Sequence, residues 1–94
     1  MYPEYTRFAD PGHSWLEVQR SELKELDIEH LISSYSYQAP SGIYLEEDGD
    51  LALFINAKAK KGNKTYQEWT EKNINTIHQD TPCWIRELHP YTTN

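Results

Sequence analysis

Cysteine is nearly absent from this sequence of 94 residues, which contains only Cys83. A single cysteine excludes an internal disulfide. There is also no apolar run of about 18 residues, the length needed to span a membrane. No secretion signal is recognisable, so we expect a cytoplasmic protein in a reducing compartment, with no membrane contact.

Glycine is also scarce, and its four residues are scattered as turn positions. This distribution excludes a glycine-rich phosphate loop. No helix-turn-helix or RNA-binding aromatic motif is present. Basic residues are few in the first half of the chain, whereas phosphate backbones are bound by basic patches. We therefore expect no direct contact with nucleic acid.

Acidic residues are plentiful, and their distribution is uneven. Residues 1–50 contain eleven acidic and three basic residues, whereas residues 51–94 contain four acidic and six basic ones. The two halves thus carry charges of −8 and +2, which give the net charge of −6. This charge fits a basic protein partner, and it equally fits plain solubility.

The length predicts a single domain over residues 1–94. Residues 1–12 contain two prolines and three aromatic rings (Tyr2, Tyr5 and Phe8), a pattern that predicts an extended N-terminal arm packed on its own domain. Alternation over 13–18 predicts a strand. The spacing of Leu23 and Leu26 predicts a helix over 20–28, capped by Ser21.

The middle of the chain has the clearest patterns. Strict alternation over 32–38, a turn at 39–42 and an apolar run at 43–47 predict a β-hairpin over 32–47. A helix is expected over about 50–61, with Asp48 or Asp50 as its N-cap, three lysines in its last turns and a left-handed Gly62 after it.

The last third is less regular. Residues 64–70 fit either a strand or the start of a helix that continues to 76, residues 73–82 resemble a loop, and residues 82–88 alternate like a strand. The predicted order is β-α-β-β-α-β-β. This order predicts a small α+β domain with a mainly antiparallel sheet and two helices on one face.

The stretch at 46–50 contains four acids in five positions. A calcium loop needs a glycine at its sixth position and an acid at its twelfth, and neither register from Glu46 or Asp48 supplies them. The acids therefore complement the start of a helix, or they form part of an acidic surface that mimics a phosphate backbone. Alternation predicts that Glu46 and Glu47 point to opposite faces of their strand.

Other reactive side chains lack informative spacing. Histidines 13, 30, 78 and 89 are not paired with one another or with Cys83 at metal-ligand spacing, so we expect no metal and no cofactor unless the fold brings them together. Cys83 stands in an apolar alternation beside Trp84, which favours a buried, inert thiol over a nucleophile. No catalytic residues are predicted.

Three stretches, "DPGHSWLEV" (10–18), "ISSYSY" (32–37) and "IYLEEDGD" (43–50), together resemble a pattern found in small, mostly unannotated proteins of tailed bacteriophages and prophages. Asp27 departs from that pattern, which has a glycine before this isoleucine. The resemblance implies no activity, but it implies a phage product that acts inside the bacterial host. Small acidic phage proteins include inhibitors of host defences and modifiers of host enzymes.

The leading hypothesis is therefore a non-enzymatic, acidic binding protein that inhibits or modulates a host protein, with nucleic-acid mimicry as one mechanism. Its expected contact surface consists of Glu22, Glu25, Glu29, Glu46, Glu47, Asp48 and Asp50. The alternatives are a structural protein that self-associates through its aromatic arm and Tyr-rich hairpin, and an enzyme that uses His13 or His78 as an acid–base group in a cleft joining two histidines.

Overall fold

The computed structural model describes residues 4–93, which form one six-stranded sheet. Neighbouring strands are antiparallel except for one parallel pair, β1 and β5. The predicted α+β class with a mainly antiparallel sheet is therefore confirmed. The strands lie in the order β5-β1-β2-β4-β3-β6, and their bounds are β1 Tyr5–Ala9, β2 Ser14–Val18, β3 Tyr37–Ala39, β4 Gly42–Glu46, β5 Ile74–His78 and β6 His89–Pro90.

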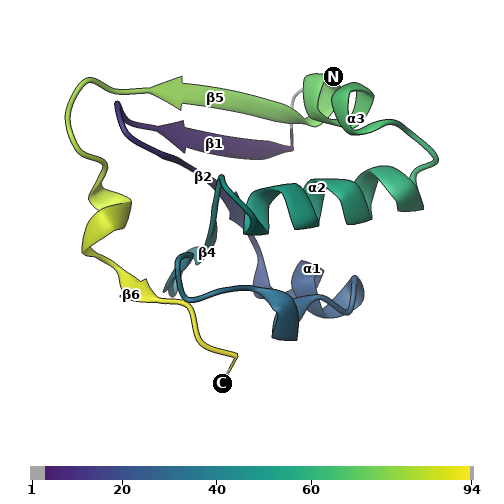
Figure 1. The fold of residues 1–94 in the computed structure, drawn as a ribbon, viewed down its shortest axis with the longest axis horizontal. Coiled ribbons are helices and arrows are strands. Elements are labelled where there is room, and N and C mark those ends of the chain that lie inside the picture. The colour runs from purple at the N-terminus through teal and green to yellow at the C-terminus, as the bar shows by residue number, and fades with distance from the viewer. Residues whose placement is uncertain (1–3, 94) are drawn as a thin grey trace.

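The α-helices lie together on one face of the sheet (Figure 1). They are α1 (Arg20–Glu25), α2 (Asp50–Lys61) and α3 (Tyr66–Asn73), and a short 3₁₀ helix η1 (Glu29–Leu31) follows α1. The two predicted helices are present, the first of them shorter than expected. The segment 64–70, which fits a strand or the start of a helix, contains the start of a third helix at Tyr66, and Thr65 caps this helix by accepting a hydrogen bond from the Glu68 N–H.

The main core fills the space between the sheet and the helices. Leu16 and Val18 of β2 contribute to it, while Trp15 points to the other face, as the alternation of β2 predicts. Phe54 of α2 is completely buried here and packs against the ring of Tyr5 at a centroid distance of 5.6 Å. Within residues 4–93, no helix is long and apolar enough to cross a membrane.

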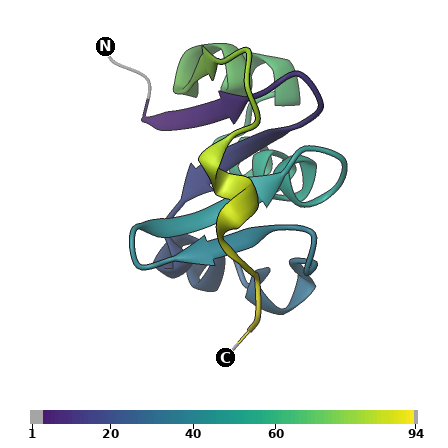
Figure 2. The same ribbon diagram turned by 90° about the vertical axis from the view of Figure 1, so that its left-hand side faces the viewer.

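The opposite face of the sheet is covered by residues 79–88, which we call the strap (Figure 2). The strap leads from β5 at one edge to β6 at the other and contains a 3₁₀ helix η2 (Trp84–Glu87). Cys83 and Ile85 are buried here against Trp15 and Tyr44 in a second, smaller core. Both faces of β2 and β4 are therefore covered, which explains why β4 is almost continuously buried.

The strand predicted over 82–88 is wrong, because this segment belongs to the strap. The carboxylate of Asp10 accepts a hydrogen bond from the Cys83 N–H at 2.9 Å and two from the Arg86 guanidinium at 2.7 and 2.9 Å. These bonds fix the segment across the sheet. The alternation that suggested a strand arises because Cys83 and Ile85 face the sheet, while Trp84 is 46% exposed.

Two other segments become strands where the sequence suggested otherwise. Residues 5–9 of the expected arm form β1, an inner strand between β2 and β5, whereas Tyr2 lies outside the described residues. The loop expected over 73–82 contains β5. Because α3 returns the chain to the open side of β1, residues 74–78 pair there in parallel over five positions.

The hairpin is present, but its first strand is shorter than predicted. Only Tyr37–Ala39 pair with β4, and residues 33–36 form a turn. The Ser33 and Ser36 side chains in this turn bind the carboxylate of Asp50 instead of lying in a ladder. Gly42 closes the hairpin with φ +155°, and a Cβ atom there would lie 2.8 Å from the Val18 carbonyl oxygen.

Three helix ends differ from the expected caps. Gln19, not Ser21, precedes α1, and its N–H donates to the Glu22 carboxylate at 3.2 Å. Gly49 is the N-cap of α2, so Asp50 is its first helical residue. The left-handed residue after α2 is Asn63 (φ +56°), since Gly62 has φ −90°.

After α1, Asp27 (φ +57°) has a conformation that favours glycine.

Candidate functional site

The seven acids of the expected contact surface have different surroundings. Asp50 is only 6% exposed and lies inside the molecule. One of its oxygens, Oδ2, accepts hydrogen bonds from the Ser33 N–H (3.0 Å), the Ser33 hydroxyl (2.7 Å) and the Ser36 hydroxyl (2.5 Å). Asp50 therefore holds the fold together, and its inclusion in a contact surface is a correction to the sequence analysis.

The acids on and after α1 are partly used within the chain. Glu22 accepts a hydrogen bond from the Tyr5 hydroxyl at 2.6 Å, and Glu29 forms an ion pair with Arg20 at 3.3 Å. Glu25 is exposed at the end of α1. Because two of these three carboxylates already have partners, α1 and η1 together offer fewer free carboxylates than the sequence suggests.

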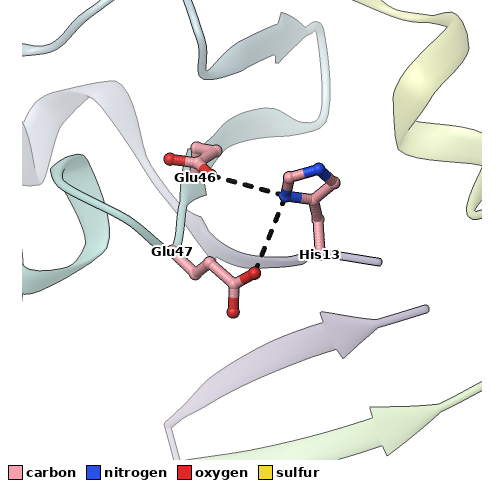
Figure 3. Close-up of side chains that lie close together, drawn as sticks. All are labelled: His13, Glu46 and Glu47. Carbon is pink, nitrogen blue, oxygen red and sulfur yellow. Dashed lines mark ion pairs between the residues drawn. The ribbon is translucent and has the colours of Figure 1, made fainter. Parts of the chain in front are cut away.

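Glu46 and Glu47, at the end of β4, converge on one histidine. The Nδ1 atom of His13 lies 3.7 Å from Oε1 of Glu46 and 3.7 Å from Oε1 of Glu47 (Figure 3). We call these three residues the His13 cluster. The prediction that the two glutamates point apart is wrong, because β4 ends at Glu46 and the alternation of a strand no longer applies to Glu47.

The turn between β1 and β2 places the imidazole. The His13 N–H donates to the Asp10 side chain at 2.9 Å, and the Asp10 N–H donates to the His13 carbonyl oxygen at 2.9 Å. Arg86 also binds this side chain, and its guanidinium holds the pKa of Asp10 well below the usual range of a carboxyl. The position of His13 is thus tied to the strap through one carboxylate.

Hydrogen bonds outside the His13 cluster orient both of its glutamates. The Ser14 hydroxyl donates to Oε2 of Glu47 at 3.0 Å, and the Asp48 N–H donates to Oε2 of Glu46 at 2.9 Å. In each carboxylate, one oxygen is thereby occupied and the other faces His13. Burial raises the pKa of Glu46, whose side chain is 13% exposed.

Beside the His13 cluster lies a pocket of about 400 Å³, which we call the aromatic pocket. Its walls include the rings of Trp15, Tyr35 and Tyr37, and Tyr35 is 77% exposed. Acidic groups reach it from Glu46 and Asp48. The remaining lining residues are His13 and Arg86.

Arg86 shows how the aromatic pocket accommodates a cation. Its guanidinium carbon lies 5.2 Å from the centre of the Trp15 ring, within the range of a cation–π contact. The charge of Arg86 is compensated by Asp10, which accepts two hydrogen bonds from the guanidinium. The carboxylates of Glu46 and Asp48 thus give the pocket an acidic rim next to aromatic walls.

A second hollow, of about 240 Å³, lies on the other side of His13 and joins it to His78 of β5. Glu47 and Asp10 also line this hollow. The cleft that the acid–base hypothesis requires between two histidines is therefore present. His30 lies in η1 and His89 in β6, and neither lines this hollow.

Trp15, Tyr37 and Arg86 are site residues that the sequence does not predict. Sheet register places the first two, because Trp15 pairs with Glu46 and Tyr37 pairs with Tyr44, whereas Arg86 of the strap is held at the site by Asp10. Register depends on long-range pairing, which a single sequence does not reveal. Comparisons with protein-family models, with curated proteins and with solved structures found no match to this chain.

Proposed function

We propose that this chain is a non-enzymatic binding protein that receives a basic side chain of a partner protein in the aromatic pocket. The observation that carries the proposal is the meeting of two carboxylates, Glu46 and Asp48, with the exposed ring of Tyr35 at one pocket. Aromatic faces and carboxylates attract the same ligand, a lysine ammonium or an arginine guanidinium.

The dimensions of the pocket support a single inserted side chain. Its volume of about 400 Å³ lies near the lower end of the range for small-ligand sites. Buried anchors in such pockets supply much of the affinity of protein interfaces. The surrounding acids would then steer a basic partner toward the pocket, an effect that salt weakens.

The resemblance to small phage proteins guides our choice of partner. We propose a bacterial host protein with an exposed basic patch, such as a nucleic-acid-binding defence or replication factor, which the phage product inhibits or modulates. Contact through Glu46, Glu47 and Asp48 would compete with phosphate groups for that patch. This mechanism agrees with a net charge of −6 and does not require one continuous acidic face.

A pull-down from bacterial lysate, with bound proteins identified by mass spectrometry, tests this proposal. The bait variants are Tyr35→Ala and the double variant Glu46→Gln/Asp48→Asn, and Glu25→Gln on α1 is the matched control. We expect one stoichiometric partner that the wild type and the control retain at low salt, and that high salt or either pocket variant removes. Equal capture by the pocket variants would contradict the proposal.

Self-association is the second candidate function. The observation that favours it is the exposure of Ile77 (46%) on edge strand β5 and of Trp84 (46%) on the strap. Deleting residues 1–9 is an unsuitable test, because it would remove the inner strand β1. Sedimentation of the full chain over a wide concentration range is decisive, since a monomer at every concentration would rule out this function.

A further inference from the structure

We propose that the His13 cluster is a binding site for a divalent transition metal, with Zn²⁺ as the ion that its donor atoms suit best. The site consists of Nδ1 of His13 and one carboxylate oxygen each from Glu46 and Glu47, and these three atoms all lie within 4.8 Å of one another. This proposal does not depend on the binding of a basic partner.

The distances are close to those of a bound ion. Zinc binds imidazole nitrogen and carboxylate oxygen at about 2.0–2.2 Å, so neighbouring ligands in a tetrahedral site lie about 3.4 Å apart. The His13 nitrogen is 3.7 Å from each of the two carboxylate oxygens. Both His13 distances are therefore within about 0.3 Å of the spacing expected in a zinc site, and the two carboxylate oxygens lie within 4.8 Å of each other.

The surroundings of the donors resemble the outer shell of a metal site. The Ser14 hydroxyl and the Asp48 N–H each donate a hydrogen bond to the far oxygen of one glutamate. The near oxygen of each glutamate is directed at His13 (Figure 3). Hydrogen bonds of this kind orient the ligands of metal sites. The backbone of His13 is fixed in the same way by Asp10.

Charge gives an independent reason for a cation at this position. Two carboxylates converge here, and the side chain of Glu46 is largely removed from water. The guanidinium of Arg86 lines the adjoining pocket, but it is bound to Asp10. A divalent ion would balance both glutamates while a neutral imidazole serves as its third ligand.

The donor set decides the class of ion. Calcium and magnesium prefer six or more oxygen ligands, whereas one imidazole with two carboxylates suits zinc and its neighbours in the first transition row. Three protein ligands leave a coordination position open. Since His13 and Glu46 line the aromatic pocket, and His13 and Glu47 line the second hollow, that position is accessible from the surface.

Calorimetric titration of the full chain with ZnCl₂, after removal of metal by a chelator, tests this proposal. We expect one ion per chain, with affinity at least tenfold lower in His13→Ala and in Glu46→Gln/Glu47→Gln. Ser14→Ala, which removes only an orienting hydrogen bond, should weaken binding by about tenfold. His30→Ala and Glu87→Gln, at exposed positions outside the His13 cluster, are matched controls that should bind like wild type.

Two further measurements keep the outcome decisive. Circular dichroism verifies that each variant is folded, and Co²⁺ added to the wild type should produce visible absorption bands that Zn²⁺ abolishes. Absence of zinc binding by the folded wild type would overturn the proposal, as would equal affinity in His13→Ala. Repeating the pull-down in the presence of a chelator separates the two proposals. The partner should still be captured, because the aromatic pocket does not require the ion.

Discussion

Replacing Asp50 by alanine should destabilise this protein more than any other loss of an acidic side chain in the stretch 46–50. One buried oxygen of Asp50 accepts three hydrogen bonds from Ser33 and Ser36. The Ser36 hydroxyl in turn accepts the Glu46 N–H at 2.9 Å. The network joins the start of α2, the turn at 33–36 and the end of β4, so its loss loosens all three.

The magnitude follows from the number and the kind of bonds. A hydrogen bond to a charged group contributes about 1.5–3 kcal/mol, but three bonds to one oxygen are not additive, and freed hydroxyls regain some partners. We therefore expect Asp50→Ala to lower the free energy of unfolding by about 3–5 kcal/mol. In a domain of this size the Tm should fall by about 15–30 °C. Asp50→Asn keeps an acceptor and should lose about 1–2 kcal/mol.

Urea denaturation and thermal melting, followed by circular dichroism, measure both variants. The control is Asp48→Ala, because Asp48 is exposed and contributes its backbone N–H, not its side chain, to the bond with Glu46. The control should stay within about 0.5 kcal/mol of wild type. If Asp50→Ala is as stable as this control, the buried network does not stabilise the fold and our reasoning fails.

Three further predictions concern the hairpin, the strap and the smaller core. Gly42→Ala should cost about 2 kcal/mol in urea denaturation, because its Cβ atom would contact a β2 carbonyl oxygen, whereas Gly49→Ala has open space and should be nearly neutral. Asp10 stabilises the fold above its unfolded pKa of about 4 and loses this contribution as the pH falls, since Arg86 lowers its folded pKa. Asp10→Asn should therefore lower the free energy of unfolding at neutral pH, and it should take up about one proton fewer than wild type when it unfolds in acid. If its free energy of unfolding has the same slope against pH as wild type, this prediction is refuted. Burial raises the pKa of Tyr44 to about 12. The tyrosine absorbance titration of Tyr44→Phe should therefore match that of wild type below about pH 11. If the variant lacks a tyrosine ionisation that the wild type shows below this pH, the side chain is not buried.

Elements governed by local patterns could be predicted from the sequence. The helix α2 was expected over 50–61 because Leu51, Phe54 and Ile55 recur at helical spacing, and these side chains are buried. The apolar run of β4 was likewise found, because a strand covered on both faces is apolar at successive positions.

Elements that depend on distant partners could not be predicted. Three of the five residues of β5 (Ile74, Thr76 and Ile77) are β-branched and favour a strand, but its apolar residues do not alternate, and its pairing depends on five positions along the open side of β1. The strap alternates like a strand because its buried side chains face a sheet, and its course is fixed by Asp10, more than 70 residues earlier. Such contacts override local propensity.

The candidate site was predicted in part for the same reason. The contact surface expected from the sequence includes Glu46, Glu47 and Asp48, although strand alternation predicts that the first two point apart. The contribution of His13 required the pairing of β2 with β4, in which Ser14 and Glu47 become neighbours. The aromatic walls from Trp15 and Tyr37 follow from the same register.

The location of the acids distinguishes a specific site from diffuse charge. Asp50 is internal and Glu22 and Glu29 have partners within the chain, whereas Glu46 and Glu47 converge on one imidazole beside a pocket. A diffuse effect would depend only on net charge, so Glu25→Gln and Glu46→Gln, which remove the same charge, should then weaken partner binding equally. A specific site predicts that the change at Glu46, which lines the aromatic pocket, weakens binding more. Measuring salt dependence for both variants in parallel therefore separates the two explanations, because only diffuse steering would give them identical slopes and affinities.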